Sequence, residues 1–475
     1  MNNNISLLVK PRVALPHDDN FCPAVLWNHA FLDCVRSSKK SIPLSVAIKK
    51  EDDSISVYKT YIFSDESEFA SANYLYVEQL VKTLLWIHGG YEIIIGGPKR
   101  IGEYIKELYS QEGKRSFDVN FMSNIYEKPF TVEIGNTKKN YPTKEKLIPL
   151  GGHLEGCRIG FDLGASDRKV SAVIDGKVVF SEEVAWNPSH QTNPNYHYHE
   201  IMSMLHHAAV HMPRVDAIGG SSAGIYINNR VMSASIFRGI SPDLFEKRVK
   251  HIFLDIQKEW GVPLEIINDG EVTALAGSIS LETNSVLGIA MGSSEAGGYI
   301  NKDGNITGWL NELAFAPIDF NTEAPVDEWS GDRGCGVQYF SQVAVIGLAR
   351  MAGITLNEKQ TSAEKLKTVQ ELMTKGDDRA KKVFETIGCY LGYGIAYYAD
   401  FYDIKHILIL GRVTSGEGGH IIIQKAEQVL KEEFPELFKN ISLHLPDESI
   451  RRVGQSIAAA SLPTLPQIIL KRSGE

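Results

Sequence analysis

Residues 160–170 read Gly-Phe-Asp-Leu-Gly-Ala-Ser-Asp-Arg-Lys-Val, an apolar strand that ends in an acidic residue and turns back into a second strand. The small residues of the turn let backbone N–H groups and the Ser166 hydroxyl approach a phosphate group, and Asp162 could hold a magnesium ion through water. A plain hairpin, in which Gly164 only satisfies the turn geometry, explains the same pattern. The stretch therefore predicts a strand–turn–strand unit and leaves both interpretations open.

A second stretch of the same design comes later in the chain. Residues 289–301 read IAMGSSEAGGYIN, in which a strand leads to Gly292 and Ser293, then to Gly297 and Gly298, and into another strand. One such loop is weak evidence of a phosphate site, whereas two loops, each in its own series of strands and helices, could hold a triphosphate from two sides. We therefore predict two similar α/β lobes that face a cleft.

The stretch Leu264–Gly277, LEIINDGEVTALAG, places Asn268 and Asp269 where a strand ends and a helix begins. Ligands of open α/β sheets bind at the carboxyl ends of the strands. A carboxylate at such a place can accept the proton of a hydroxyl that attacks a phosphorus atom. Asn and Asp are also common helix N-caps, so a purely structural role is the alternative.

A third glycine-rich turn follows the apolar strand in residues 407–423, ILILGRVTSGEGGHIII. Gly411 would let the backbone pack closely against a flat ring such as adenine. A plain strand-to-helix turn is the alternative, because glycine also marks turns that bind nothing.

Residues 1–135 predict a small α/β domain. Alternating apolar residues indicate strands, and apolar residues at helical spacing indicate helices. The expected elements are a hairpin at 44–48 and 55–57, a helix at 77–85, a strand at 92–97, a helix at 101–109 and a strand at 117–121. The lysine-rich stretch that follows lacks an apolar period, so we expect a linker at residues 136–153.

Composition and charge narrow the class of protein. The chain has 475 residues, 43% hydrophobic and 23% charged, which is typical of a globular protein rather than a disordered or collagen-like one. It carries 49 Lys and Arg against 58 Asp and Glu, a net charge of −9, so it lacks the concentrated positive charge that nucleic-acid binding uses. We expect no nucleic-acid partner and no membrane attachment. The five widely spaced cysteines predict a reducing compartment, and hence a cytoplasmic protein.

The order of these stretches resembles that of the ROK family, which comprises sugar kinases and sugar-responsive repressors with the actin/hexokinase-like (ribonuclease H-like) fold. The resemblance covers residues 157–475 and rests on DLGAS at 162–166, GGSSAG at 219–224, NDGEVTALAG at 268–277, GSSEAGGYI at 292–300, NEL at 311–313 and ILGR at 409–412. It implies a first lobe at 154–267 and a second lobe at 268–475. The final helix, GQSIAAASL from Gly454, would pack back on the first lobe.

The resemblance also implies roles for individual residues. Asp269 would be the catalytic base, and the sugar would be bound by Ser222, Gly224, Asn268 and Glu312. The nucleotide would be bound by Asp162, Gly164, Ser166, Lys169, Gly292, Ser293, Gly297, Gly298 and Gly411. The implied cofactors are ATP and Mg²⁺, and the implied assembly is a homodimer.

Departures from the family pattern concern a metal site and the phosphate loops. Phe315 stands where the family has a zinc-ligating histidine, and of the family's three cysteines only Cys335 remains, with Glu328 and Ser330 in the other two places. One thiolate does not make a zinc site, so we predict no structural zinc and no other metal-ligand set. The loops that would bind the nucleotide are altered at Asp167, Glu295 and Arg412.

The predicted function is ATP-dependent phosphorylation of a sugar hydroxyl in a glucokinase-like reaction, with a hexose or an amino sugar as the acceptor. The alternative is a non-catalytic sugar-binding regulator or interaction protein on the same fold. The retained Asp269 and Glu312 favour the kinase, whereas the altered loops and the additional N-terminal domain favour the alternative.

Overall fold

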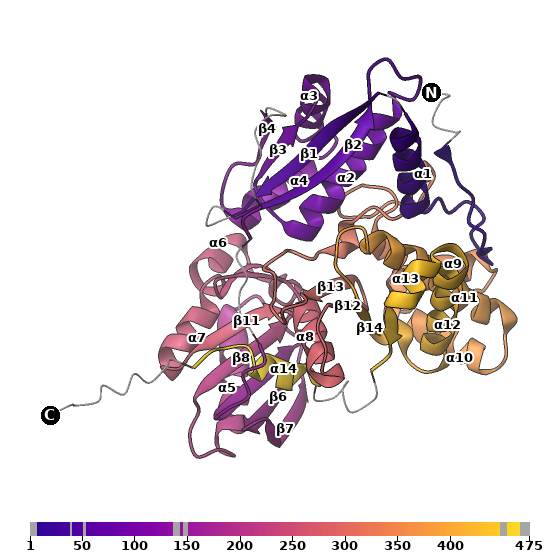
Figure 1. Ribbon diagram of the computed structural model, residues 1–475. Coiled ribbons are helices and arrows are strands. Elements are labelled where there is room, and N and C mark those ends of the chain that lie inside the picture. Colours follow the sequence, from indigo (N-terminus) through magenta and orange to yellow (C-terminus); the bar gives the residue numbers. More distant parts are fainter. Residues whose placement is uncertain are drawn as a thin grey trace. The chain divides into compact units, whose positions relative to one another are not determined.

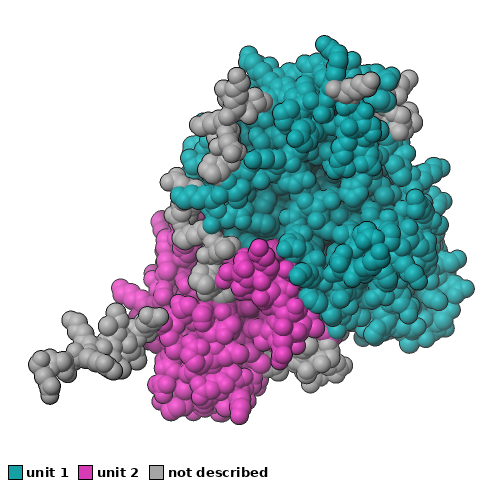
Figure 2. All heavy atoms as spheres, viewed as in Figure 1, with its two compact units in different colours: residues 1–147, 287–297, 307–445 teal, residues 148–286, 298–306, 446–475 magenta. Residues whose placement is uncertain are grey.

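The computed structural model describes residues 7–38, 40–50, 54–135, 143–145, 151–446 and 454–465, and the chain forms two compact units. Unit 1 combines residues 1–147, 287–297 and 307–445, and unit 2 combines residues 148–286, 298–306 and 446–475 (Figure 2). The predicted linker at 136–153 lies largely outside the described residues, and the predicted domain boundaries stay predictions. Among the described residues, none of the helices offers an apolar stretch that would reach across a bilayer.

The N-terminal part of unit 1 is a four-stranded sheet with helices packed against it (Figure 1). The strands are β1 (Ser41–Lys49), β2 (Ile55–Phe63), β3 (Glu92–Gly96) and β4 (Thr131–Gly135), and the helices are α1 (Ala24–Ser37), α2 (Ala72–His88), α3 (Lys99–Leu108) and α4 (Ser116–Tyr126). The strand order is β2-β1-β3-β4, with β1 antiparallel to both neighbours and β3 parallel to β4. The predicted hairpin is confirmed, since Val46 lies opposite Tyr58.

The prediction of a strand at 117–121 is wrong, because these residues lie in α4. The sequence Phe-Asp-Val-Asn-Phe alternates apolar and polar residues and so resembles a strand. Over a longer window, Val119, Met122 and Tyr126 recur at helical spacing, and all three are buried. The strand at the edge of the sheet, β4, comes later and is largely exposed, so it carries little apolar signal.

Unit 2 contains a five-stranded sheet formed by β5 (Cys157–Leu163), β6 (Asp167–Ile174), β7 (Lys177–Ala185), β8 (Ala217–Ser222) and β11 (Leu264–Asn268), in the order β11-β8-β5-β6-β7. Strands β5, β8 and β11 are parallel, and β6 and β7 continue the sheet antiparallel. Helices α5 (Pro194–Ala209) and α7 (Ile252–Trp260) cover its apolar core, and α8 (Asp269–Leu281) starts directly after β11. The smaller elements are β9 (Ile225–Ile227), β10 (Arg230–Ser233) and α6 (Pro242–Leu244).

Helix α14 (Gln455–Ala460) packs on the face of this sheet opposite to the apolar core. Successive residues of a strand point to opposite faces, so Ile159 and Ile218 lie in the core while Gly160 and Gly219 face the helix. A Cβ atom would lie 1.7 Å from the Ser456 carbonyl oxygen at Gly160 and 1.6 Å from the Ala459 carbonyl oxygen at Gly219. Two strands without side chains on this face therefore let a helix backbone rest directly on the sheet.

Gly219→Ala is expected to destabilise the protein by about 1–3 kcal/mol, because the new methyl group displaces α14 backbone that cannot move aside like a flexible side chain. The measurement is the denaturant midpoint. The matched control is Gly347→Ala, an exposed position inside a helix with open space where the Cβ would be, and it should be neutral or stabilising. Equal midpoints for the two variants would contradict the direct contact between helix and sheet.

The remainder of unit 1 carries most of a second sheet and a group of helices. The strands are β12 (Val286–Met291), β13 (Glu295–Ile300), β14 (His406–Leu410) and β15 (Ser442–His444), in the order β13-β12-β14-β15. The helices are α9 (Gln342–Met351), α10 (Ser362–Thr374), α11 (Asp378–Tyr398), α12 (Glu417–Glu433) and α13 (Pro435–Asn440). Helix α11 is buried over most of its length and packs against α12 and α1, so it joins the N-terminal sheet to the rest of unit 1.

Candidate functional site

The candidate site in unit 2 lies at the carboxyl ends of β5, β8 and β11. The parallel register sets Leu163 beside Ser222 and Ser222 beside Asn268, so the three strands end level with one another. One residue earlier, Asp162 lies beside Ser221. Polar side chains from three strands and from the start of α8 therefore gather at one edge of the sheet, which is where open α/β sheets bind ligands.

Asn268 caps helix α8 and fixes the chain at this edge. Its side-chain oxygen accepts a hydrogen bond from the Gly270 N–H at 2.7 Å, and its side-chain nitrogen donates to the Gly224 carbonyl oxygen at 2.7 Å. The carboxylate of the next residue, Asp269, also accepts a hydrogen bond from the Gly270 N–H, at 3.0 Å. Asn268 thus has the structural role of the N-cap and holds Asp269 at the first turn of the helix.

The surroundings of Asp269 suit proton transfer near neutral pH. Burial and the charge of Asp162 raise the pKa of Asp269 to about 6, although the Gly270 N–H acts to lower it. Burial also raises the pKa of Asp162, while Ser221 and Lys169 lower it. A carboxyl group whose pKa lies close to the working pH can both take up and release a proton.

The loop after β5 is closed by backbone hydrogen bonds. The Gly164 N–H donates to the Asp167 carbonyl oxygen at 2.9 Å, and the Trp186 indole N–H donates to the Gly164 carbonyl oxygen at 2.8 Å. The Asp167 carboxylate accepts from the Ser166 hydroxyl at 3.0 Å and lies 3.6 Å from the Lys169 Nζ. The negative charge that Asp167 adds at the start of β6 is therefore offset by the Lys169 ammonium group two residues further along the same strand.

The other two glycine turns adjoin each other in unit 1. The turn between β12 and β13 is closed by a hydrogen bond from the Gly292 N–H to the Ser294 carbonyl oxygen at 2.9 Å, and Ser293 is exposed. Gly411, after β14, has a φ of +105°, and a Cβ atom there would lie 2.3 Å from the Met291 carbonyl oxygen. Only glycine permits this backbone at this distance. The exposed Ser293 hydroxyl and the two glycine turns at Gly292 and Gly411 therefore lie together at the ends of β12 and β14.

The two glycines of β13 lie in tightly packed backbone. A Cβ atom on Gly297 would lie 2.7 Å from the Asn311 carbonyl oxygen, within unit 1. A Cβ atom on Gly298 would lie 2.1 Å from the Gly270 carbonyl oxygen, within unit 2. Gly298 therefore brings β13 against the first turn of α8, next to the residue that follows Asp269.

Glu295 lies in the core of unit 1, although its place in the sequence suggests a loop carboxylate. It is 2% exposed, and the Tyr398 hydroxyl donates to its Oε1 at 3.1 Å. Burial raises the pKa of Glu295 to about 8, with a further contribution from Glu312 and an opposing one from Tyr398. A carboxyl group with this pKa is mostly neutral at pH 7, so it adds little negative charge beside the turn between β12 and β13. Arg412 is exposed beside Gly411.

Glu312 lies in a segment of unit 1 that is held by helix α2. The Glu312 N–H donates to the Trp86 carbonyl oxygen at 3.0 Å, and the Asn311 N–H donates to the Ile87 carbonyl oxygen at 2.9 Å. Asn311 has a left-handed φ of 52°, and its side-chain oxygen accepts from the Tyr402 hydroxyl at 2.9 Å. The backbone on either side of the partly buried Glu312 is therefore fixed by the N-terminal region.

The positions at which the resemblance would place zinc ligands do not fit zinc. The Phe315 ring stacks on Trp86, Glu328 is exposed, and the Ser330 hydroxyl donates to a neighbouring aspartate. Cys335 is fully buried, and burial raises the pKa of its thiol to about 12, which keeps it protonated. In the described ranges, no group of three or more His, Cys, Asp and Glu side chains is arranged to hold a metal ion.

Two side chains near Asp162 and Asp269, Ser221 and Tyr226, are not among the residues predicted from the sequence. The sequence prediction names Ser222, whose hydroxyl donates to a backbone carbonyl at 3.2 Å, whereas Ser221 is the serine that lowers the pKa of Asp162. Burial and the charges of both aspartates raise the pKa of Tyr226. Only the register of β5 and β8 shows that Ser221, and not Ser222, lies beside Asp162. No local sequence pattern indicates a role for Tyr226.

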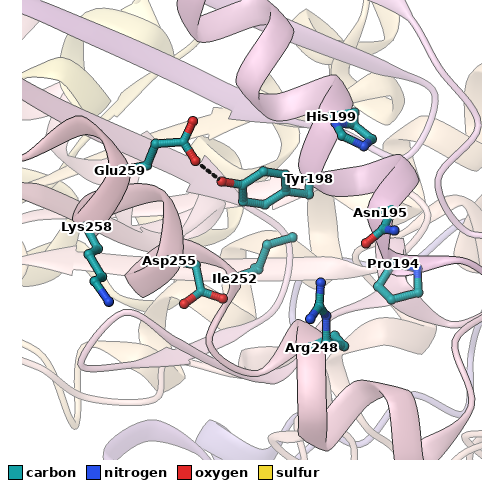
Figure 3. A pocket seen from close by; sticks show the side chains of 9 residues that line it. All are labelled: Pro194, Asn195, Tyr198, His199, Arg248, Ile252, Asp255, Lys258 and Glu259. Carbon is teal, nitrogen blue, oxygen red and sulfur yellow. Dashed lines mark hydrogen bonds between the residues drawn. The ribbon is translucent and has the colours of Figure 1, made fainter.

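A surface hollow of about 700 Å³ lies on unit 2 between α5 and α7 (Figure 3). Cations and anions line it in mixture, and the Tyr198 hydroxyl donates to Glu259. None of the site residues predicted from the sequence lines this hollow. The candidate site is therefore the edge of the sheet at Asp162 and Asp269, and the hollow is a separate surface feature.

Comparison with known proteins identifies the family. The model of the ROK family matches residues 158–448, more than half of the chain. The chain belongs to the ROK family. No curated protein matches it.

Solved structures of ROK proteins share the fold. A ROK family glucokinase from Streptomyces griseus, in complex with glucose and AMPPNP, is 19% identical with a TM-score of 0.50 and covers 65% of this chain and 99% of its own. A ROK family transcriptional regulator, a homologue of the E. coli MLC protein, is 18% identical with a TM-score of 0.53, and the match covers 65% of this chain and 78% of the regulator. The ROK hexokinase from Thermus thermophilus is 16% identical with a TM-score of 0.51, and the match covers 64% of this chain and 97% of the hexokinase.

At these identities the likeness shows the fold alone. The predicted family and fold class are confirmed: this ROK chain has the hexokinase-like α/β fold, and an N-terminal α/β region precedes the ROK domain. The family contains both kinases and a regulator, so membership is compatible with either activity.

Proposed function

We propose that this ROK protein is an ATP-dependent sugar kinase that phosphorylates a hydroxyl group of a hexose or an amino sugar. The observation that carries the proposal is Asp269, a carboxylate at the level ends of three parallel strands whose pKa is raised to about 6. The fold shared with a glucokinase that binds glucose and AMPPNP supports a sugar and a nucleotide as the two ligands.

In the proposed reaction, Asp269 orients the acceptor hydroxyl and takes its proton as the sugar oxygen attacks the terminal phosphorus of ATP. A new oxygen–phosphorus bond forms, the bond to the bridging oxygen breaks, and ADP leaves. Asn268 and Glu312 would bind other hydroxyls of the sugar, together with Ser222 and the backbone at Gly224. Because Asn268 is already fixed as the N-cap of α8, it offers the sugar a preorganised partner.

The nucleotide would be bound by the glycine turns. Ser166 and Lys169 from the first turn and the exposed Ser293 from the second would contact the phosphate groups, and the bare backbone at Gly411 would lie against the adenine. Magnesium supplied with ATP would offset the phosphate charge, and the Asp162 carboxylate is a group that this ion prefers. The homodimer and the cytoplasmic location stay predictions.

The second candidate is a regulator that binds the sugar without turnover. The shared fold with a ROK transcriptional regulator is the observation that favours it. The two candidates differ in one respect that can be measured, namely whether a bound sugar leaves phosphorylated.

A panel assay separates the two candidates. The full chain is incubated with magnesium and ATP and with each of a set of hexoses and N-acetylhexosamines, and ADP release is followed. Sugar-dependent ADP release supports the kinase. Sugar binding by calorimetry without ADP release on any member of the panel, and without ATP binding, overturns it in favour of the regulator.

The pH dependence of the reaction is expected to follow Asp269. A base must be ionised to accept a proton, and the pKa of about 6 means that Asp269 becomes neutral below that pH. At saturating nucleotide, kcat/KM for the sugar should therefore be flat above pH 7 and fall about tenfold per pH unit below the pKa. The measurement is a rate profile from pH 4.5 to 8. A profile that stays flat to pH 4.5 would show that Asp269 is not the base.

A further inference from the structure

Within unit 1, helix α2 of the N-terminal region contacts residues 311–335, the segment that carries Glu312, at several points. Two backbone carbonyls at its C-terminal end, of Trp86 and Ile87, accept hydrogen bonds from Glu312 and Asn311 at 3.0 and 2.9 Å. These carbonyls belong to the last turn of α2, where helix hydrogen bonding leaves carbonyl groups available. The contact therefore uses groups that the end of the helix supplies without distortion.

The Trp86 side chain continues this contact. Its indole ring stacks on Phe315 with 4.2 Å between ring centroids, and its Nε1–H donates to the Asp118 Oδ1 at 3.2 Å. Phe117 and Phe121 of α4 surround the same pair of rings. Phe315 ends the short 3-10 turn that begins directly after Glu312, so the turn is held by hydrogen bonds at its start and by stacked rings at its end.

A buried ionic network holds the later part of the same segment. Lys82, one turn before Trp86 on α2, is 1% exposed and pairs with Asp118 and Asp332. Arg115, at the start of α4, pairs with Asp332 at 2.6 Å and with Glu78 at 2.7 Å. Two cations of the N-terminal region thus neutralise Asp332, which lies in the loop before Cys335.

This ionic network lies next to Cys335, the one cysteine that remains of the zinc ligands of the family pattern. Lys82 lies close enough to Cys335 for its charge to act on the thiol. The phenyl ring at position 315 has no atom that could ligate a metal, and the single thiol of Cys335 does not make a zinc site. In the family pattern a metal would join position 315 to positions 328–335. In this chain, Trp86 contacts the first of these places, and Lys82 and Arg115 contact Asp332 in the second.

We propose that the N-terminal region serves as a built-in replacement for a structural metal, with Trp86 as the positioning residue that sets the place of Glu312. The effect on sugar binding rests on the function proposed above, whereas the effect on the segment does not. The N-terminal region is on this view a part of the sugar site rather than an appended module.

The test compares Trp86→Phe with the matched control Trp27→Phe in the full chain. Both tryptophans are buried at 2% exposure or less in the N-terminal region, but Trp27 stacks on Phe31 and meets Phe320 edge-on, away from the 311–315 turn. Hydrogen exchange followed by mass spectrometry should show amides 311–315 exchanging about tenfold faster in Trp86→Phe and unchanged in Trp27→Phe. Equal exchange at 311–315 in the two variants overturns the proposal.

The kinetic readout separates positioning from loss of stability. Trp86→Phe should raise the KM for the sugar about tenfold while the KM for ATP stays within about twofold, because only Glu312 is displaced. Phe315→Leu approaches the contact from the other side, and the double variant should add little to either single one. Faster exchange at 311–315 without binding of any sugar supports the positioning role and refutes the proposed function. Fully additive effects of Trp86→Phe and Phe315→Leu on exchange refute the shared contact.

Discussion

Asp269→Asn is expected to lower kcat for sugar phosphorylation by about 10²–10⁴-fold while sugar binding is kept. The amide has nearly the shape of the carboxylate and can still contact a hydroxyl, but it cannot take up the proton that the attacking oxygen must lose. Since Asn268 provides the helix cap, the substitution leaves the start of α8 intact. The measurement is single-turnover phosphorylation next to calorimetric titration with the same sugar.

The stability of this variant supplies an internal check. The pKa of Asp269 is higher in the folded protein than its ordinary value, so the folded state favours the neutral form and loses stability as the pH rises through about 6. Asp269→Asn should therefore be at least as stable as the parent protein at pH 7. The matched control is Asp243→Asn, an exposed carboxylate on unit 2 that pairs with Lys247 at 3.5 Å and should leave kcat unchanged. A kcat equal to that of the parent protein would refute Asp269 as the base.

Lys82→Met is expected to destabilise the protein by about 3–5 kcal/mol. The lysine is buried between Asp118 and Asp332, and its loss leaves two buried carboxylates with one fewer cation. Methionine fills nearly the same volume, so the loss reports on charge rather than on a cavity. The measurement is chemical unfolding followed by the fluorescence of the buried tryptophans.

The control for this prediction is Lys114→Met. Lys114 pairs with Glu78 of the same network at 2.7 Å but is 60% exposed, so water screens the pair and its removal should cost less than about 1 kcal/mol. Similar losses for the two variants would mean that the ionic network contributes no more than surface ion pairs do.

Local sequence patterns predict an element correctly where all the residues that determine it lie in one short segment. The glycine turn at 160–170 and the strand end at Asn268 were both predicted, because strand, turn and cap signals lie within a few residues of each other. The segment at 117–121 shows the limit of such patterns, since a window of five residues fits a strand while the burial of Val119, Met122 and Tyr126 follows a helix.

Contacts between distant segments could not be predicted in this way. Glu295 follows a turn in the sequence, but its buried carboxyl group accepts a hydrogen bond from Tyr398, 103 residues away. Lys82 looks like an ordinary polar residue of a helix, and its partner Asp332 lies 250 residues further along the chain. The sequence predicted most of the elements and the residues at the sheet edge, whereas the role of the N-terminal region depends on which charges meet in three dimensions.

The ion pair between Lys82 and Asp332 also bears on how the protein is made. The 250 residues between them take roughly 12–50 s to synthesise at about 5–20 residues per second. During that time Lys82 and Arg115 have emerged from the ribosome, and the carboxylate they will neutralise together does not yet exist. The first part of the chain to be synthesised therefore cannot form these ion pairs until the later part of unit 1 has been made.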